Sequence, residues 1–362
     1  KDKLNFHKKR KHNKIKLSTY KKNKMPYKNN FFDRIIMCHV YEHVDKPEDF
    51  IEDFETALAN EVNSFDAKVR YMINFVVGNK GKRLRPLLVH SSCNIKYHST
   101  KQDIIKASVI VELIHIATLI HDDVIDNAKV RRNKATLHGI VDANEAILAG
   151  DILLSHALEI ASSFSSTIVC REVSQATKAT CIGEVNQSFA QRNYETTYAE
   201  YEQILRGKTG KLFACACRLG AKLCNADESV VGYVTRFAEN LGIAYQLYDD
   251  AMDVFGSEAD SHKTLKTDLK TNKVTLPVIL LLESCCEEER NPIIEMFQNY
   301  DDNESKLNEV FEAYDIKQKC CETIAEKLNG MNTCIANVGY LPIADKMKNI
   351  SEKICNKIKY TL

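Results

Sequence analysis

The chain has 362 residues, of which 44% are hydrophobic, and it contains only 13 glycines and 6 prolines. This length suits two average domains or one large helical domain, and the shortage of Gly and Pro favours long helices. The longest apolar runs, such as LPVILLL at Leu276–Leu282, are too short to cross a bilayer. Composition therefore excludes a typical membrane-spanning protein and predicts a soluble one without a transmembrane segment.

Basic charge is concentrated at the start of the chain. The formal net charge is +1, but residues 1–30 hold 12 Lys or Arg and the single acid Asp2. We predict that residues 1–40 form a basic, disordered tail without apolar periodicity, and that residues 41–362 form a helical domain. An acid-poor tail favours organelle targeting, to a mitochondrion or plastid; without targeting the protein would be cytoplasmic. A nucleic-acid-binding tail is the weaker interpretation, because no aromatic platform or binding motif accompanies the charge.

Thirteen cysteines are scattered along the chain. Close pairs such as Cys215/Cys217 and Cys285/Cys286 do not suggest a disulfide framework, and no paired CxxC spacing indicates zinc. We therefore expect reduced thiols inside helices.

Apolar residues recur at intervals of three and four through most of the chain, which predicts helices. No segment shows the sustained alternation that is typical of a strand. We therefore predict an all-α fold, a large single-domain helical bundle whose interior helices are apolar almost all round. The expected helices cover residues 45–77, 87–97, 103–126, 144–164, 167–191, 197–224, 227–255, 275–286, 291–300, 305–313 and 318–359.

Two acidic clusters share the pattern DDxxD. They consist of Asp122, Asp123 and Asp126, and of Asp249, Asp250 and Asp253. Each follows an apolar helical run, so each lies at a helix C-terminus, where the helix dipole makes acids unfavourable. Residues four positions apart project from one face, so the outer aspartates of each cluster can share a cation. Carboxylate oxygens suit Mg²⁺ held together with substrate phosphates, and we infer metal-bridged phosphate binding.

Phosphate binding also needs cations, and these follow the turns and the acidic clusters. They are Lys82 and Arg85 in GKRLRP, Arg131 and Arg132 after the first cluster, Lys208 in RGKTGK, and Lys263 and Lys273 after the second cluster. Adjacent arginines next to a metal cluster favour bidentate contacts to phosphate oxygens.

With these residues in view, the chain resembles the trans-isoprenyl diphosphate synthases, and most of all the long-chain octaprenyl and polyprenyl diphosphate synthases. These all-α enzymes join isopentenyl diphosphate to an allylic diphosphate around a central cavity. The motifs that carry the resemblance are GKRLRP (Gly81–Pro86), ELIHIATLIHDDVIDNAKVRR (Glu112–Arg132), AGD (Ala149–Asp151), GKTGKLF (Gly207–Phe213), YQLYDDAMDVFG (Tyr245–Gly256) and TDLKTNKVTLP (Thr267–Pro277). The sequence departs from the family pattern at Asn133, His262 and Lys266.

The resemblance implies a role for each candidate. The two aspartate clusters would face each other and hold about three Mg²⁺ and the allylic diphosphate (farnesyl or geranylgeranyl). Further contacts to this diphosphate would come from Arg131, Lys208 and Lys263. Isopentenyl diphosphate would be bound by Lys82, Arg85, His115 and Arg132. Thr209 and Gln246, with Lys208, would stabilise the developing carbocation. A homodimer is also implied by the family.

Product length should depend on what blocks the cavity beneath the first cluster. Five and four residues before Asp122 stand the small side chains of Ala117 and Thr118, where farnesyl-producing members of the family carry a bulky aromatic residue. The resemblance therefore implies an open tunnel and an octaprenyl-type product for a quinone side chain. The alternatives are a geranylgeranyl diphosphate synthase and a non-catalytic partner subunit, although such subunits typically lose one acidic motif.

Overall fold

Helices account for nearly all of the regular structure in the part of the chain that the computed structural model describes. That part comprises residues 47–78, 81–93, 101–131, 134–256, 265–338, 343–348 and 350–352. Its elements are α3 (Pro47–Asn63), α4 (Ala67–Gly78), α5 (Leu84–Ser91), α6 (Lys101–Ile125), β1 (Val130–Arg131), β2 (Lys134–Ala135), η2 (Leu137–Gly139), α7 (Ala143–Ser162), α8 (Ile168–Ala190), α9 (Tyr198–Leu205), η3 (Arg206–Gly210), α10 (Lys211–Leu223), α11 (Glu228–Phe255), α13 (Thr267–Lys270), α14 (Leu276–Ser284), α15 (Glu287–Gln298), α16 (Tyr300–Ala313) and α17 (Ile316–Ala336).

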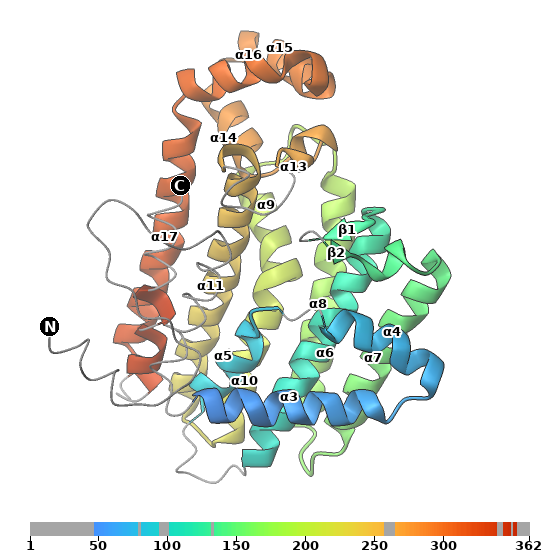
Figure 1. The fold of residues 1–362 in the computed structure, drawn as a ribbon. Helices are drawn as coiled ribbons and strands as arrows, with labels where there is room; N and C mark the ends of the chain where they lie inside the picture. Colours follow the sequence, from blue (N-terminus) through green and yellow to red (C-terminus); the bar gives the residue numbers. More distant parts are fainter. Residues whose placement is uncertain are drawn as a thin grey trace, which may run out of the picture.

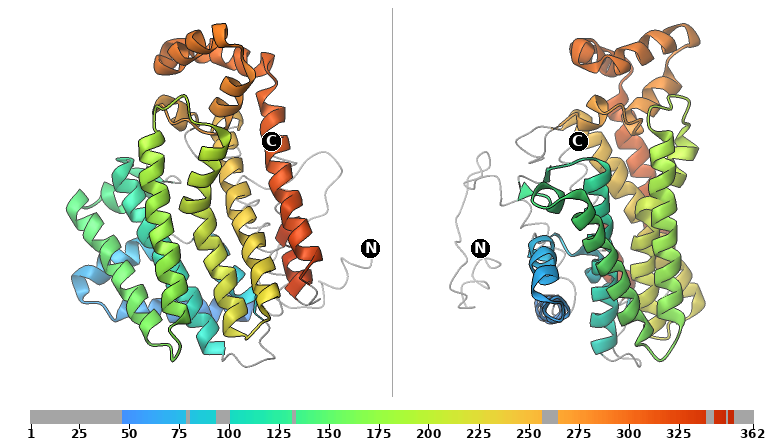
Figure 2. Two further views of the ribbon diagram at one scale, coloured as in Figure 1. Left: turned by 180° about the vertical axis from the view of Figure 1, so that it is seen from behind. Right: turned by 90° about the vertical axis from the view of Figure 1, so that its right-hand side faces the viewer.

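The long helices α6, α8, α10, α11 and α17 stand side by side, and α3 crosses one end of them (Figure 1). The helices α15 and α16 lie across the other end, and both further views show the same bundle (Figure 2). Buried residues occur on every side of α6 and α11, from Ile104 to Asp123 and from Val231 to Val254. These two helices therefore form the interior, as the nearly continuous apolar pattern predicts, and the all-α prediction is confirmed.

Several predicted boundaries are wrong for local reasons. The expected helix over 45–77 is interrupted after Asn63, because the Asp66 side chain accepts from the amides of Lys68 and Val69 and starts α4. Helix α5 begins at Leu84 rather than at residue 87, because Pro86 is tolerated in a first turn whose amides need no helical partner. The last long helix ends at Ala336 instead of continuing unbroken toward residue 359.

A two-stranded hairpin, which the sequence pattern did not predict, follows the first acidic cluster. Strands β1 and β2 pair Val130 with Ala135 and Arg131 with Lys134. The strands have only two residues each, too few for any alternation to be recognised. The hairpin brings Arg131 back toward the end of α6.

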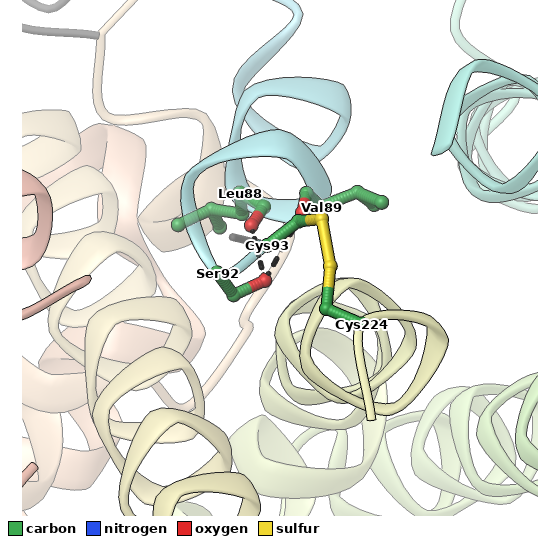
Figure 3. The surroundings of a disulfide bond; sticks show 5 residues. All are labelled: Leu88, Val89, Ser92, Cys93 and Cys224. Carbon is green, nitrogen blue, oxygen red and sulfur yellow. Dashed lines mark hydrogen bonds between the residues drawn. A yellow bond between two sulfur atoms is a disulfide. The ribbon is translucent and has the colours of Figure 1, made fainter. Parts of the chain in front are cut away.

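A disulfide joins Cys93 to Cys224, so the expectation that the cysteines are all reduced is wrong for this pair (Figure 3). Cys93 lies two residues after α5 and Cys224 one residue after α10. Gly220 lets the two helices approach, because a Cβ atom there would lie 2.0 Å from the Val89 carbonyl oxygen. The bond closes 131 residues of chain and fixes the C-terminal end of α5 against α10. Sequence spacing gives no sign of a contact between such distant helix ends.

By length and composition, α6 is the one helix in the described residues that could cross a membrane, although 67% of its apolar window is buried inside the bundle. The core helix of a bundle passes the same test. From the sequence, no segment was predicted to be long and apolar enough to cross a bilayer. That prediction did not identify α6, because the apolar residues of α6 are interrupted by polar ones and only uninterrupted runs were considered. The predicted basic tail, residues 1–40, lies outside the described residues.

Candidate active site

The C-terminal ends of α6 and α11 lie at the same end of the bundle, close to the hairpin and to α13 (Figure 1). A short segment connects them. The amide of Asp268 donates to the Asp253 carboxylate over 3.0 Å, and the Lys273 ammonium binds the Asp126 carboxylate over 3.0 Å. The amide of Lys273 in turn donates to the Asp268 carbonyl. One turn of chain therefore contacts both acidic clusters.

The first cluster divides into an outer pair and a buried residue. Asp122 is partly buried and Asp126 is exposed, whereas Asp123 is only 7% exposed and accepts from the Arg131 guanidinium over 2.7 Å. Burial raises the pKa of Asp122 to about 6, and Glu184 and Asp126 add to this against the opposing charge of Lys208. The carboxylate of Asp122 is therefore unfavourable in the protein alone and would be stabilised by an added cation.

The second cluster has the same division. Asp250 is 5% exposed, while Asp249 and Asp253 are partly buried. The Asp250 carboxylate accepts from the Tyr201 hydroxyl and, over 2.9 Å, from the Gln246 amide. Burial, with Asp268 nearby, raises the pKa of Asp250 to about 8. Donors therefore occupy both of its oxygens, and Asp249 and Asp253 remain the more accessible pair.

Lys208 and Thr209 lie on η3, a π-helical turn between α9 and α10. Such turns are frequent at functional sites because the extra residue per turn redirects side chains. The Lys208 ammonium contacts Glu184 and the Gln187 side-chain oxygen, both on α8, at 2.6 Å each. A Cβ atom at Gly183 would lie 2.3 Å from the Lys208 amide nitrogen, so only glycine allows this approach of α8.

Thr209 links the lysine to the second cluster. Its hydroxyl donates to the Gln246 side-chain oxygen over 3.4 Å, and Gln246 donates to Asp250 from the same helix. Lys208, the residue before Thr209, also lowers the pKa of Asp122 by its charge. The turn η3 therefore places one residue that acts on the first cluster beside one that contacts Gln246.

Lys82, two residues before α5, and Arg85, in its first turn, approach α11 and α10 respectively. The Lys82 ammonium lies 5.8 Å from the ring centroid of Tyr245, the residue before Gln246, and the Arg85 guanidinium lies 4.5 Å from the Phe213 ring. Burial lowers the pKa of Arg85 to about 10, and its Nε has no hydrogen-bond partner among the described residues. A partly buried cation whose Nε is an unused, buried donor suits an anionic ligand.

On α6, one face carries several of the predicted residues. His115, Thr118 and Asp122 are all partly buried, and their spacing of three and four places them in one row. The Thr118 hydroxyl donates to the His115 carbonyl over 2.8 Å. Ala117 lies on another face and is completely buried. Of the two residues predicted to set product length, only Thr118 is therefore partly accessible.

Two predicted phosphate contacts, Arg132 and Lys263, lie outside the described residues. Conversely, the sequence interpretation missed three residues of this site: Glu184, Gln187 and Tyr201. Together with Asp126 and Lys273, these residues line one pocket. Glu184 could have been suspected because acidic residues are rare on α8. Nothing in the sequence distinguishes Tyr201 from the other tyrosines.

No three His, Cys, Asp or Glu side chains among the described residues gather closely enough to chelate a metal ion by themselves. A Mg²⁺ ion, however, usually binds one or two carboxylates and takes its remaining ligands from water and substrate phosphate. The accessible pairs Asp122/Asp126 and Asp249/Asp253 match that requirement in oxygen chemistry and in number.

Comparison with known proteins identifies the family of this chain. The family model of polyprenyl synthetases matches residues 66–314. Geranylgeranyl diphosphate synthase of Saccharolobus solfataricus is 32% identical over 270 residues, which cover 68% of this chain and 79% of that protein. All-trans-nonaprenyl-diphosphate synthase (geranyl-diphosphate specific) of Rhodobacter capsulatus is 33% identical over 233 residues, or 64% of this chain and 71% of that protein.

Among solved structures, a polyprenyl synthase from Caulobacter crescentus, complexed with calcium and isoprenyl diphosphate, has a TM-score of 0.79 at 23% identity. The superposition covers 88% of this chain and 97% of that one, and it shows a shared fold. This chain belongs to the polyprenyl synthetase family and is a prenyltransferase, which confirms the resemblance inferred from its motifs.

We predict that Tyr201→Phe destabilises the folded protein by about 1.5–3 kcal/mol, because a buried carboxyl group loses one of its two donors. Thermal unfolding in the absence of metal would measure the loss. The matched control is Tyr314→Phe, which removes an exposed hydroxyl that donates to Glu289 over 2.6 Å and should leave the melting temperature unchanged. Equal effects of the two substitutions would show that Tyr201 does not support Asp250.

Proposed function

We propose that this prenyltransferase condenses isopentenyl diphosphate repeatedly onto an allylic diphosphate and releases a long-chain, octaprenyl-type diphosphate. The observation that carries the proposal is the position of the two DDxxD clusters. Both end interior helices at one end of the bundle, and Lys273 and Asp268 connect them. A site with two accessible acid pairs and surrounding cations suits a metal-bound diphosphate.

The accessible aspartates are the residues that would hold the metal. We propose about three Mg²⁺ at Asp122, Asp126, Asp249 and Asp253, with Asp123 and Asp250 supporting their neighbours from buried positions. When bound, the ions act as Lewis acids that neutralise the charge on the departing diphosphate. The Caulobacter crescentus protein, which has the same fold, was solved with calcium and isoprenyl diphosphate. That complex supports the proposal that this chain binds a divalent cation and a diphosphate.

The chain's own cations complete the site in two groups. Arg131, Lys208 and Lys273 lie beside the aspartates and would bind the allylic diphosphate, with Lys263 as a further contact. Lys208 now binds Glu184 and Gln187, so it must exchange these partners for phosphate oxygens when substrate enters. Thr209 and Gln246 would face the carbocation, whose charge their oxygens stabilise.

Isopentenyl diphosphate would bind on the other side, at Lys82, Arg85 and His115, with Arg132 as a further contact. The contacts of the two groups support this division, because Lys82 and Arg85 lie against aromatic rings of α11 and α10, whereas Arg131 and Lys273 bind aspartates of the first cluster. Burial of Arg85 strengthens its interaction with an anion, since little water competes.

We predict that Asp122→Asn lowers kcat by about 10³-fold, because one metal-ligating charge is lost. The same substitution should leave the melting temperature of the metal-free protein equal or higher, since the buried charge is unfavourable there. Activity would be measured with labelled isopentenyl diphosphate, farnesyl diphosphate and Mg²⁺.

The control is Asp302→Asn, because Asp301 and Asp302 form an adjacent, exposed pair of aspartates on α16 outside both DDxxD clusters. Chelation of Mg²⁺ should abolish activity and its return should restore it. Full activity of Asp122→Asn would contradict the proposed metal site.

Thr118 is the residue on which the long-chain assignment depends. Relatives named for short and for long products match this chain at nearly the same identity, so similarity does not decide the length. Thr118 is small, partly accessible and one turn before Asp122. An elongating apolar chain that leaves the aspartates along α6 would therefore meet no bulky side chain at this turn.

We predict that Thr118→Tyr shortens the main product, because the phenol ring would block growth one helical turn below the aspartates. Chromatography of the dephosphorylated products would measure the change. Thr323→Tyr on α17 is the matched control, since Thr323 is also partly buried and donates to a helical carbonyl over 2.9 Å. An unchanged product distribution with Thr118→Tyr would refute the open path.

We also propose a homodimer. The neighbouring helices α7 and α8 expose seven large apolar side chains, and these are Ile147, Leu148, Leu158, Ile168, Ile182, Val185 and Phe189. Phe189 is the most exposed of them, at 82%. Apolar residues so grouped favour burial against a second copy of the chain.

Phe189→Asp should raise the dimer dissociation constant at least about 100-fold, because it would bury an unpaired charge. Sedimentation equilibrium would show the shift toward monomer. Tyr71→Asp, which replaces a side chain that is 67% exposed on α4, should leave the association unchanged. If both variants remain dimeric, the interface lies elsewhere.

A further inference from the structure

The motif GKRLRP contains three cations, and the middle one, Arg83, has surroundings unlike those of its neighbours. Lys82 and Arg85 contact rings of α11 and α10, whereas the Arg83 side chain lies among α3, α4 and α6. Arg83 is 5% exposed. It therefore occupies the opposite side of the same short segment from the cations proposed to bind isopentenyl diphosphate.

Each part of the Arg83 guanidinium has an acceptor. Nε donates to Glu55 over 2.9 Å, Nη1 to Glu112 over 2.6 Å, and Nη2 to the Val77 carbonyl over 3.2 Å. Burial disfavours the charge, yet Glu112 and Glu55 outweigh it and raise the pKa of Arg83 above its usual value. A planar group with several fixed donors suits such a set of acceptors, and an ammonium could not reproduce it.

The backbone at Arg83 is also constrained. Its φ is 47° and its ψ is 33°, a left-handed conformation that a residue with a side chain adopts at a cost in free energy. This residue immediately precedes α5, and its carbonyl accepts from the Leu87 amide. The ion pairs therefore hold the chain in the conformation that sets the start of α5 between Lys82 and Arg85.

Glu112 interacts with both Arg83 and Arg85. It is 3% exposed on α6, three residues before His115, and its charge also acts on Arg85. One buried carboxylate thus neutralises Arg83 and remains near Arg85 without saturating it. The acceptors of Arg83 are therefore separate from the aromatic rings that Lys82 and Arg85 contact.

We propose that Arg83 is a positioning residue: its contacts with Glu112, Glu55 and the Val77 carbonyl fix the segment so that Lys82 and Arg85 converge on the diphosphate of isopentenyl diphosphate. This inference rests on the proposed function. Arg83 itself does not touch the substrate.

The test is Arg83→Lys, which keeps the charge and the same backbone requirement but loses the fork of donors. We expect the KM for isopentenyl diphosphate to rise about tenfold, since small misplacements of binding groups are costly. The KM for farnesyl diphosphate should not change, and kcat should remain within about twofold. The dissociation constant for isopentenyl diphosphate, measured by calorimetry without the allylic substrate, should rise in step with its KM.

Arg290→Lys is the matched control, because Arg290 on α15 likewise has three donor contacts, to two carbonyls and one glutamate, where Arg83 has one carbonyl and two glutamates. It should leave both KM values unchanged. Glu55→Gln removes the negative charge of one acceptor at a partly exposed position, and it provides a second test should Arg83→Lys fail to fold. We expect it to raise the KM for isopentenyl diphosphate by a smaller factor.

The outcomes separate the inference from the proposed function. One outcome is that Lys82→Met raises the KM for isopentenyl diphosphate while Arg83→Lys and Glu55→Gln leave it unchanged. That result would refute the positioning role of Arg83 and leave the proposed function standing. If Lys82→Met also leaves that KM unchanged, the assigned binding site is wrong, and the inference fails with it. A lower melting temperature with both KM values unchanged would show a purely structural role for Arg83.

Discussion

Repulsion among carboxylates at the ends of two interior helices is the constraint on which the rest of this structure depends. Aspartates there are opposed by the helix dipole and by burial, and burial raises the pKa values of Asp122 and Asp250 above their usual range. The protein compensates part of this charge with its own donors. Arg131 binds Asp123, Lys273 binds Asp126, and Tyr201 and Gln246 bind Asp250. The compensation is partial, which suits a site that takes up metal ions together with a diphosphate.

The surrounding helices hold the binding groups in place by close packing. The π-helical turn η3 presents Lys208 and Thr209, and Gly183 allows α8 to approach that turn directly. At the opposite side, α5 is fixed at both ends. The ion pairs of Arg83 hold its beginning, and the disulfide between Cys93 and Cys224 holds its end (Figure 3). Binding groups on such rigid supports lose little entropy when a ligand arrives.

Residues of one motif that carry the same charge differ in burial and in partners. Arg83 is buried and paired with Glu112 and Glu55, whereas Arg85, two residues later, is partly buried beside Phe213 with its Nε donor unused in the described part of the protein. The same holds for the aspartates, since the middle residue of each cluster is buried and the outer two are more accessible. Two similar residues in one motif therefore have different surroundings, and this difference is the basis for proposing different roles for them.

The sequence by itself determined the helical fold, the family and most of the candidate site, because apolar periodicity and the spacing DDxxD are local properties of the chain. It also determined that Asp122 and Asp126 share a helical face. Only the tertiary structure decided that Tyr201 and Glu184 join the site, that Ala117 is buried while Thr118 is partly accessible, and that Arg83 turns away from Lys82. It likewise decided that Cys93 meets Cys224. These features depend on contacts between helices that are distant in the chain, and such contacts leave no periodic pattern in a single sequence.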